Sequence, residues 1–227
     1  MEYGQFCPVA KAMECLGERW TLLILREMHI GATRFSELQR GLILISPTIL
    51  TKRLNDLAAA ELILRKKIPG QRGYEYFLTR SGKETLPILK VIGEWGMCWA
   101  RGDLRDSDIN VELLMLYLQR SIKPNQLPGG QTVIRFQFTN LKTLNNWWLI
   151  VKGENVDVCL EDPGQEVDVY FTTNLRTMVE CWMGDKAYSA SIKDKTLKLV
   201  GPPALTRNVK DWLSDSVFAG IRPAHEI

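Results

Sequence analysis

The segment from Ile45 to Ile63 constrains the fold of this chain more than any other stretch. Ser46 followed by Pro47 is a helix-start signal, because serine caps the first free amide groups and proline suits the first helical position. Four apolar residues then recur on one face at the α-helical spacing: Leu50, Leu54, Leu57 and Ala58. Residues 46–58 are therefore expected to form an amphipathic helix that packs on a core through its leucines.

The opposite face of this helix carries short polar side chains. Thr48, Lys52 and Asn55 lie there, with Thr51 on the flank. Such side chains can reach both phosphates and base edges in a DNA major groove, although a polar helix face can also be ordinary solvated surface. Arg53 lies nearer the leucines, so we expect it to pack or to contact a phosphate rather than to read a base.

A hairpin with a basic tip is expected next. Two β-rich runs, 63–68 and 74–78, flank the turn-forming segment 69–73. Its basic residues are Arg65, Lys66, Lys67 and Arg72. Residues 34–90 contain 11 Lys and Arg against 5 Asp and Glu, a local net charge of +6 that is compatible with a nucleic-acid surface.

Other helices complete the first part of the chain. Helical spacing of apolar residues predicts a helix that follows Gly17–Arg19 and ends near His29, and a short helix over 36–41. A long helix is expected from Thr79 or Ser81 to about Ala100, with a kink at Pro87.

This first part resembles the HxlR-type transcriptional regulators, relatives of the MarR group with a winged helix-turn-helix fold. The resemblance covers about residues 6–100 and is carried by the segments 7–9, 17–25, 34–39, 45–54, 74–79 and 95–96. Glu18 and Arg19 depart from it, since the family usually has glycine or lysine there. The resemblance implies a homodimer joined through its terminal helices, with the 46–58 helix in the major groove and the hairpin wing beside or in the minor groove.

The expected partner is therefore a double-stranded DNA operator with palindromic half-sites, about 34 Å apart for one helical turn. The expected DNA contacts are Arg34, Ser36, Ser46, Thr48, Thr51, Lys52, Arg53, Asn55, Lys66, Lys67, Gln71, Arg72 and Tyr74.

The second part of the chain has a different pattern. A capped helix over 107–119 is followed by strands over 132–139, 147–151, 156–160 and 167–172, helices over 174–184 and 186–194, a strand over 196–201 and a helix over 202–213. This order resembles the sterol-carrier-protein type-2-like domain, on the segments 148–153, 168–175 and 197–201, with Gly201-Pro202 where that family usually has Gly-Asp. The expected fold class is α+β, with a winged-helix domain at 1–104 and a sterol-carrier-like domain with a mainly antiparallel sheet at 105–227.

The second resemblance implies an apolar tunnel for fatty acyl chains, sterols or other hydrophobic molecules. Five aromatic residues could line it or simply fill a core: Phe136, Trp148, Phe171, Trp182 and Tyr188. The expected function is that of a homodimeric regulator modulated by an apolar small molecule.

The numbers of cysteines and histidines argue against a catalytic function. The chain has five cysteines without a C-x-x-C pair and only two histidines, so we expect no disulfide framework, no metal site, no cofactor and no enzyme activity. No apolar run approaches the ~18 residues of a membrane span, and no signal peptide is recognised, so a cytoplasmic protein is expected.

Two rival functions remain open. Cys7 lies just before the first expected helix, where a helix N-terminus can lower a thiol pKa, and it could make the protein a sensor of oxidants or electrophiles. Alternatively, the protein could be a lipid carrier in which the winged helix serves only for dimerisation.

Overall fold

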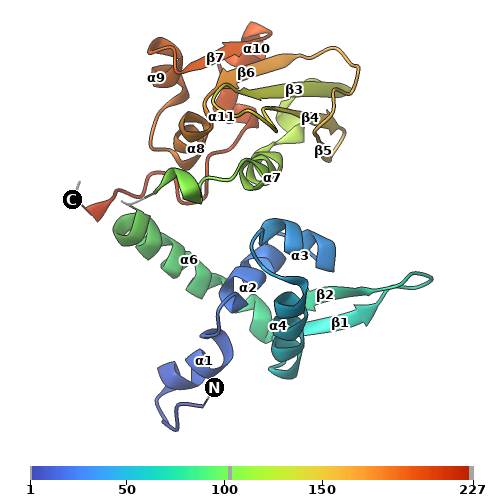
Figure 1. Ribbon diagram of the computed structural model, residues 1–227, viewed down its shortest axis with the longest axis vertical. Helices are drawn as coiled ribbons and strands as arrows, with labels where there is room; N and C mark the ends of the chain where they lie inside the picture. The colour runs from blue at the N-terminus through green and yellow to red at the C-terminus, as the bar shows by residue number, and fades with distance from the viewer. Residues whose placement is uncertain (1, 102–103, 225–227) are drawn as a thin grey trace. The chain divides into compact units, whose positions relative to one another are not determined.

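The computed structural model describes residues 2–101 and 104–224 (Figure 1). The chain divides into two compact units, Met1–Trp95 and Gly96–Ile227, each with its own apolar core. Gly102 and Asp103, in the polar stretch where the domain boundary is expected, lie outside the described residues. None of the helices in the described ranges is long and apolar enough to cross a membrane.

The first unit contains four helices, a two-stranded hairpin and two further helices. Their bounds are α1 Pro8–Leu16, α2 Thr21–His29, α3 Phe35–Gly41, α4 Pro47–Ala59, β1 Ile63–Lys67, β2 Tyr74–Leu78, α5 Arg80–Lys83 and α6 Leu86–Trp95.

Helix α4 confirms the prediction made from the leucine spacing. The Ser46 hydroxyl oxygen accepts a hydrogen bond from the Ile49 amide at 3.3 Å, which caps the helix as the Ser-Pro signal predicts. Its three leucines are almost fully buried in the core of the first unit: Leu50, Leu54 and Leu57. Burial of this leucine face fixes which side of α4 remains open to solvent.

The hairpin extends away from the helices of its unit (Figure 1). β1 and β2 pair antiparallel, with Ile63 opposite Leu78 at the base and Lys67 opposite Tyr74 near the tip. The middle of β2 is anchored on the loop before α3, because the Tyr76 amide donates to the Thr33 carbonyl at 2.8 Å. The wing is thus attached to the helical core through β2 as well as through its base.

The expected long helix over about 79–100 is wrong as a single element. The structure has α5, then α6, then a π-helical turn at Gly96–Ala100. Pro87 lacks an amide hydrogen and its ring would clash with the carbonyl four residues earlier, so the helix stops at Lys83 and restarts at Leu86, with Pro87 in the first turn. The proline therefore separates two helices instead of bending one.

The second unit combines one sheet with short helices. Its elements are η1 Gly96–Ala100, η3 Asp106–Asp108, α7 Val111–Ser121, η4 Pro124–Gln126, β3 Gln131–Phe138, β4 Asn146–Lys152, β5 Asn155–Cys159, β6 Val169–Thr173, α8 Leu175–Met183, α9 Tyr188–Lys193, β7 Leu197–Val200, α10 Pro203–Thr206 and α11 Val209–Trp212.

The five strands form one mixed sheet in the order β5-β4-β3-β6-β7. Only β3 and β6 run parallel, and the other three pairings are antiparallel, as the sequence predicts. One face of the sheet packs into the core of the second unit, through Ile134, Phe136 and Phe138 of β3 and their neighbours on β4 and β6. Since side chains alternate along a strand, Arg135 of β3 and Trp148 of β4 lie on the opposite face.

Two helix predictions in the second unit need correction. The helix expected over 107–119 begins at Val111, because Asn110 rather than Ser107 supplies the cap, accepting from the Leu113 amide at 3.0 Å. The helix expected over 202–213 is two short helices, α10 and α11. Asn208 leaves the helical backbone conformation between them, as asparagine does readily.

Candidate nucleic-acid interface

The solvent face of α4 carries the side chains that the sequence singled out. Thr48, Thr51, Lys52 and Asn55 are all exposed and line one shallow surface depression, together with Pro47 and Asp56. The Lys52 ammonium has no ion-pair partner within the described ranges. This face therefore offers one free positive charge among short hydrogen-bonding groups.

Two of the predicted contacts also bond within their own helix. The Thr51 hydroxyl donates to the Pro47 carbonyl at 2.9 Å, so its oxygen remains free only to accept. The Ser46 hydroxyl oxygen instead accepts a hydrogen bond from the Ile49 amide, which leaves the hydroxyl hydrogen of Ser46 free to donate. The local helix geometry thus decides which hydrogen-bonding role each side chain can offer to a ligand.

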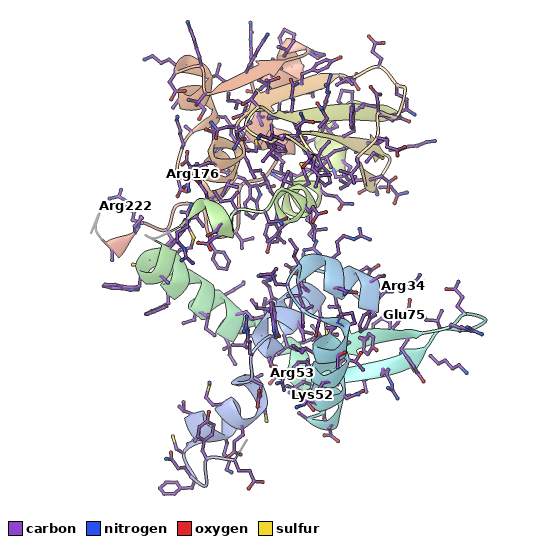
Figure 2. All side chains as sticks on the ribbon, viewed as in Figure 1. Arg34, Lys52, Arg53, Glu75, Arg176 and Arg222 are labelled. Carbon is purple, nitrogen blue, oxygen red and sulfur yellow. The ribbon has the colours of Figure 1, made fainter. Side chains whose placement is uncertain are left out.

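Arg53 does not share this solvent face. One terminal nitrogen of its guanidinium donates to Glu18 and the other to Asp56, both at 2.8 Å, and its side chain is only 14% exposed. Arg53 therefore ties α4 to the loop before α2, whereas the preceding residue, Lys52, is exposed (both residues are labelled in Figure 2). Glu18 is not among the predicted functional residues. Its departure from the family pattern is the sequence feature that could have drawn attention to it.

The wing carries an exposed basic surface. Lys66, Lys67, Gln71, Arg72 and Tyr74 are all exposed on the hairpin. Gly70 and Gly73 have positive φ angles that favour glycine and form the turn at the tip.

Two cations of the wing rest on aromatic rings. The Arg65 guanidinium lies 4.3 Å from the centre of the Tyr74 ring, and the Lys66 ammonium lies 5.2 Å from that of Phe77. Cation–π contacts restrict the motion of otherwise flexible side chains and so pre-arrange positive charge along the hairpin. Arg65 was not in the predicted contact set, although its place in the basic run could have suggested it.

The loop before α3 connects the wing to the helices. The Arg34 guanidinium lies 3.7 Å from the Glu75 carboxylate of β2, and both residues are labelled in Figure 2. Burial opposes ionisation of Glu37, but hydrogen bonds from the Thr33 and Arg34 amides outweigh it and lower the pKa of this carboxyl. Ser36, in the first turn of α3, is exposed and follows Arg34 closely in the sequence.

Cys7 precedes α1, as predicted from the sequence. Its side chain is partly exposed, and the backbone amide groups of Ala10 and Val9 lower the pKa of its thiol. The thiol therefore lies at the N-terminus of a helix, where the anion is favoured.

The five aromatic residues predicted to bind a ligand do not form one cluster. The rings of Phe136 and Phe171 stack at 4.6 Å in the core, and Trp212, which the sequence did not single out, meets Phe171 edge-on at 6.1 Å. Tyr188 belongs to the same buried core, whereas Trp148 lies on the opposite face of the sheet.

Trp182 is fixed at the edge of that core. Its ring stacks on Tyr117 at 5.0 Å, and its indole nitrogen donates to the Ser121 hydroxyl at 2.8 Å. Sequence spacing could not show which of these rings would meet, because their strands and helices are far apart in the chain.

A compact helical core, a polar-faced helix after a tight turn and a β-hairpin beside it define a winged helix-turn-helix protein. The chain belongs to the HxlR-like helix-turn-helix family, whose model matches residues 15–103. The model of the SCP-2 sterol transfer family matches residues 114–214, which contain the sheet of the second unit.

Two related proteins each match less than half of this chain. The uncharacterised HTH-type transcriptional regulator YvaP of Bacillus subtilis is 36% identical over 101 residues, covering 44% of this chain and 94% of YvaP. The uncharacterised HTH-type regulator MT3179 of Mycobacterium tuberculosis is 42% identical over 91 residues, covering 39% of this chain and 56% of MT3179.

A solved structure of a putative MarR-family regulator from Porphyromonas gingivalis is also similar. It is 35% identical with a TM-score of 0.39, and the match covers 44% of this chain and 95% of that protein.

Proposed function

We propose that this protein is a cytoplasmic, homodimeric transcriptional regulator that binds a specific DNA operator through α4 and the hairpin wing. The observation that carries the proposal is the solvent face of α4, where Lys52 has no acidic partner among the described residues and short polar groups surround it. The names of the relatives support the same assignment, since they are called transcriptional regulators. Regulators of this kind bind DNA and are not ordinarily enzymes.

The two parts of the surface would have different tasks. Thr48, Thr51, Lys52 and Asn55 would enter the major groove, where their donors and acceptors can distinguish base edges. The wing residues Lys66, Lys67 and Arg72 would contact phosphates, with Gln71 and Tyr74 beside them. Arg34, Ser36 and Ser46 would contact the sugar-phosphate backbone of the DNA close to α3 and α4. Arg53 would contribute indirectly, by fixing α4.

Exposed apolar side chains support the proposed dimer. Helix α6 is rich in apolar residues and has no fully buried one, and Val91, Ile92 and Trp95 are 64%, 48% and 61% exposed. Phe6 and Val9, at the start of α1, are 99% and 70% exposed. Apolar surface of this extent favours association, and a second copy of the chain would cover it and set two α4 helices at a fixed spacing.

The second unit would bind the signal. Its match to the SCP-2 sterol transfer family supports an apolar small molecule as the ligand, with Phe136, Phe171, Trp182 and Tyr188 as the proposed contacts. Such a ligand changes DNA affinity only if it binds the DNA-competent and incompetent dimers with different affinity.

The test is a titration of the purified full-length protein against DNA from upstream of its own gene, with a scrambled duplex as control, at two salt concentrations. Phosphate contacts alone weaken steeply with salt and do not discriminate between sequences. Specific binding that survives raised salt supports the regulator. If no genomic fragment is bound and an organic extract of the protein contains stoichiometric lipid, the protein is a lipid carrier instead.

A second function is favoured by the position of Cys7. Its lowered pKa at the start of α1 favours reaction with oxidants or electrophiles, and α1 belongs to the proposed dimer contact. A thiol sensor would lose operator affinity on treatment with diamide, and Cys7→Ser would remove that response without altering affinity before treatment. Equal responses of the wild type and Cys7→Ser would exclude it.

A further inference from the structure

The face of the sheet turned away from the core has a row of five register partners, one from each strand. In strand order they are Cys159, Trp148, Arg135, Tyr170 and Val200. Arg135 is the middle member and carries the only charge in the row. Its register neighbours are Trp148 on β4 and Tyr170 on β6, and both of these residues are aromatic.

Arg135 has few partners for a partly buried cation. One terminal nitrogen donates to the Asn146 side-chain oxygen at 2.8 Å, and the guanidinium carbon lies 5.6 Å from the centre of the Trp148 ring. Its Nε is buried without an acceptor, and no carboxylate in the described ranges forms an ion pair with it. Two acidic residues lie on this face within one row of Arg135. Asp168, directly before β6, accepts a hydrogen bond from the Val133 amide at 2.8 Å through Oδ2, and Asp157 of β5 is exposed and paired across the strands with Ile150.

Trp148 adds a second donor without an acceptor. The residue is 5% exposed, and its indole Nε1 is buried with no hydrogen-bond partner in the described parts of the chain. A buried donor left without an acceptor costs about 1–3 kcal/mol, more when the group is charged. Two such donors, one of them on a guanidinium that forms no ion pair in the described ranges, are suited to an acceptor that carries negative charge.

On the other side of Arg135 the row continues over two exposed residues, Tyr170 and Val200. Tyr170 is 37% exposed and Val200 is 46% exposed, and the two are register partners on β6 and β7. They extend from Arg135 toward the edge of the sheet, so a molecule held at Arg135 by its acid group could lay an apolar body over them.

We propose that this sheet face binds the carboxylate of a small amphipathic acid, with Arg135 and Trp148 donating to its oxygens and Tyr170 and Val200 contacting its apolar part. The site is distinct from the buried aromatic core on the other face of the sheet. Arg135 is specific for this role because a guanidinium can pair with a carboxylate while its flat face rests on an aromatic ring. The proposal does not depend on DNA binding by the first unit.

The experiment uses the full-length protein labelled with ¹⁵N and two probes of equal chain length, sodium octanoate and octan-1-ol. The indole N–H resonance of Trp148, identified as the one absent from Trp148→Phe, reports on the site directly. Octanoate is expected to shift this resonance downfield and to bind at least tenfold more tightly than octan-1-ol. An unmoved resonance, or equal affinity for acid and alcohol, would overturn the proposal.

Matched variants assign the effect to Arg135. Arg135→Met, which keeps an unbranched apolar side chain, is expected to weaken octanoate binding at least tenfold. Lys198→Met removes an exposed charge from the same sheet face, on β7, and is expected to change the affinity for octanoate less than twofold. Octanoate affinity that is unchanged in Arg135→Met, or lowered equally by both variants, contradicts the proposal.

If circular dichroism shows that Arg135→Met does not fold, Trp148→Phe decides the outcome by calorimetric titration. The phenylalanine keeps a ring beside the guanidinium but removes the indole donor. The affinity for octanoate is expected to fall about fivefold, and an unchanged affinity would overturn the proposal. Operator binding measured without octanoate is a separate readout, so failure of this proposal and failure of the DNA-binding proposal are distinguishable.

Discussion

The Arg53 guanidinium and the Glu18 carboxylate form an ion pair at 2.8 Å across 35 residues of sequence. The pair joins the loop before α2 to the middle of α4, and a second contact to Asp56 holds the other end of the guanidinium. Arg53 is thereby directed away from the solvent face of α4, and Lys52 is left as the free cation of that face among the described residues. The pair thus connects α4 to the rest of the first unit in addition to the packing of its leucines.

Glu18→Gln is expected to lower the free energy of unfolding by about 1 kcal/mol, because it replaces a charge-assisted hydrogen bond to a mostly buried guanidinium with a neutral one. Chemical denaturation measures the change. Glu61→Gln is the control, since Glu61 is exposed and forms no ion pair in the described part of the chain. Equal stability of both variants would show that the pair does not hold α4.

Lys52→Ala and Lys67→Ala should affect DNA binding differently. Loss of a base contact by Lys52 should cost specific binding about 1–3 kcal/mol and reduce discrimination against a scrambled duplex. Loss of a phosphate contact by Lys67 should weaken binding to both duplexes alike. It should also make the slope of log K against log salt concentration shallower by about one unit, the value for one phosphate contact. Fluorescence anisotropy on both duplexes measures this, and wild-type binding by both variants would mean that the assigned DNA face is wrong.

Gly41→Ala tests the close approach of α3 to α2. A Cβ at residue 41 would lie 2.0 Å from Glu27 Oε2, and Glu27 is fully buried, with its carboxylate hydrogen-bonded by Arg26 at 2.8 Å. Because the buried carboxylate cannot swing away, a loss of at least about 2 kcal/mol of unfolding free energy is expected. The control is Gly129→Ala, where nothing lies within 4 Å of the added carbon, and equal melting temperatures for the two variants would contradict the packing.

Asp194 gives the second unit a pH dependence in acid. Hydrogen bonds from Lys186 at 2.5 Å and from the Thr196 hydroxyl at 2.6 Å lower the pKa of Asp194 to about 2 from an ordinary 3.8. A lowered pKa stabilises the fold above the unfolded-state value, and the contribution is lost as pH falls through the folded-state value. The stability difference between the wild type and Asp194→Asn should therefore be constant above about pH 5 and shrink between pH 4 and 2. A difference that does not change over that interval in urea unfolding would refute the assignment.

Ile92→Glu addresses the proposed dimer. A charge in the apolar surface of α6 should convert dimers to monomers, because burying an unpaired carboxylate on association is unfavourable. Sedimentation equilibrium measures the mass of the particle. Val217→Glu, at a 90% exposed position of the second unit, is the control and should leave association unchanged. A wild-type protein that is monomeric at all concentrations would remove this part of the proposal.

Local sequence signals determined the elements of the first unit with few errors. The Ser46-Pro47 start, the spacing of Leu50, Leu54 and Leu57 and the Pro/Gly turn of the wing act within one helix or one hairpin, so they can be read without knowing the rest of the fold. Pro87 is the exception: the sequence shows that a proline disrupts the helix, but whether it bends or ends the helix depends on how the neighbouring turns are packed.

Contacts between distant residues were decided only by the tertiary structure. The sequence identified Phe136, Trp148 and Phe171 as aromatic residues on strands, but the pairing register places Trp148 on the opposite face of the sheet from the other two. It identified Arg53 as basic, but the partner that turns it away from solvent lies 35 residues earlier. Periodicity records which side of one element is apolar; which residues of two elements meet depends on chain reversal and on packing of the whole core, and no short segment contains that information.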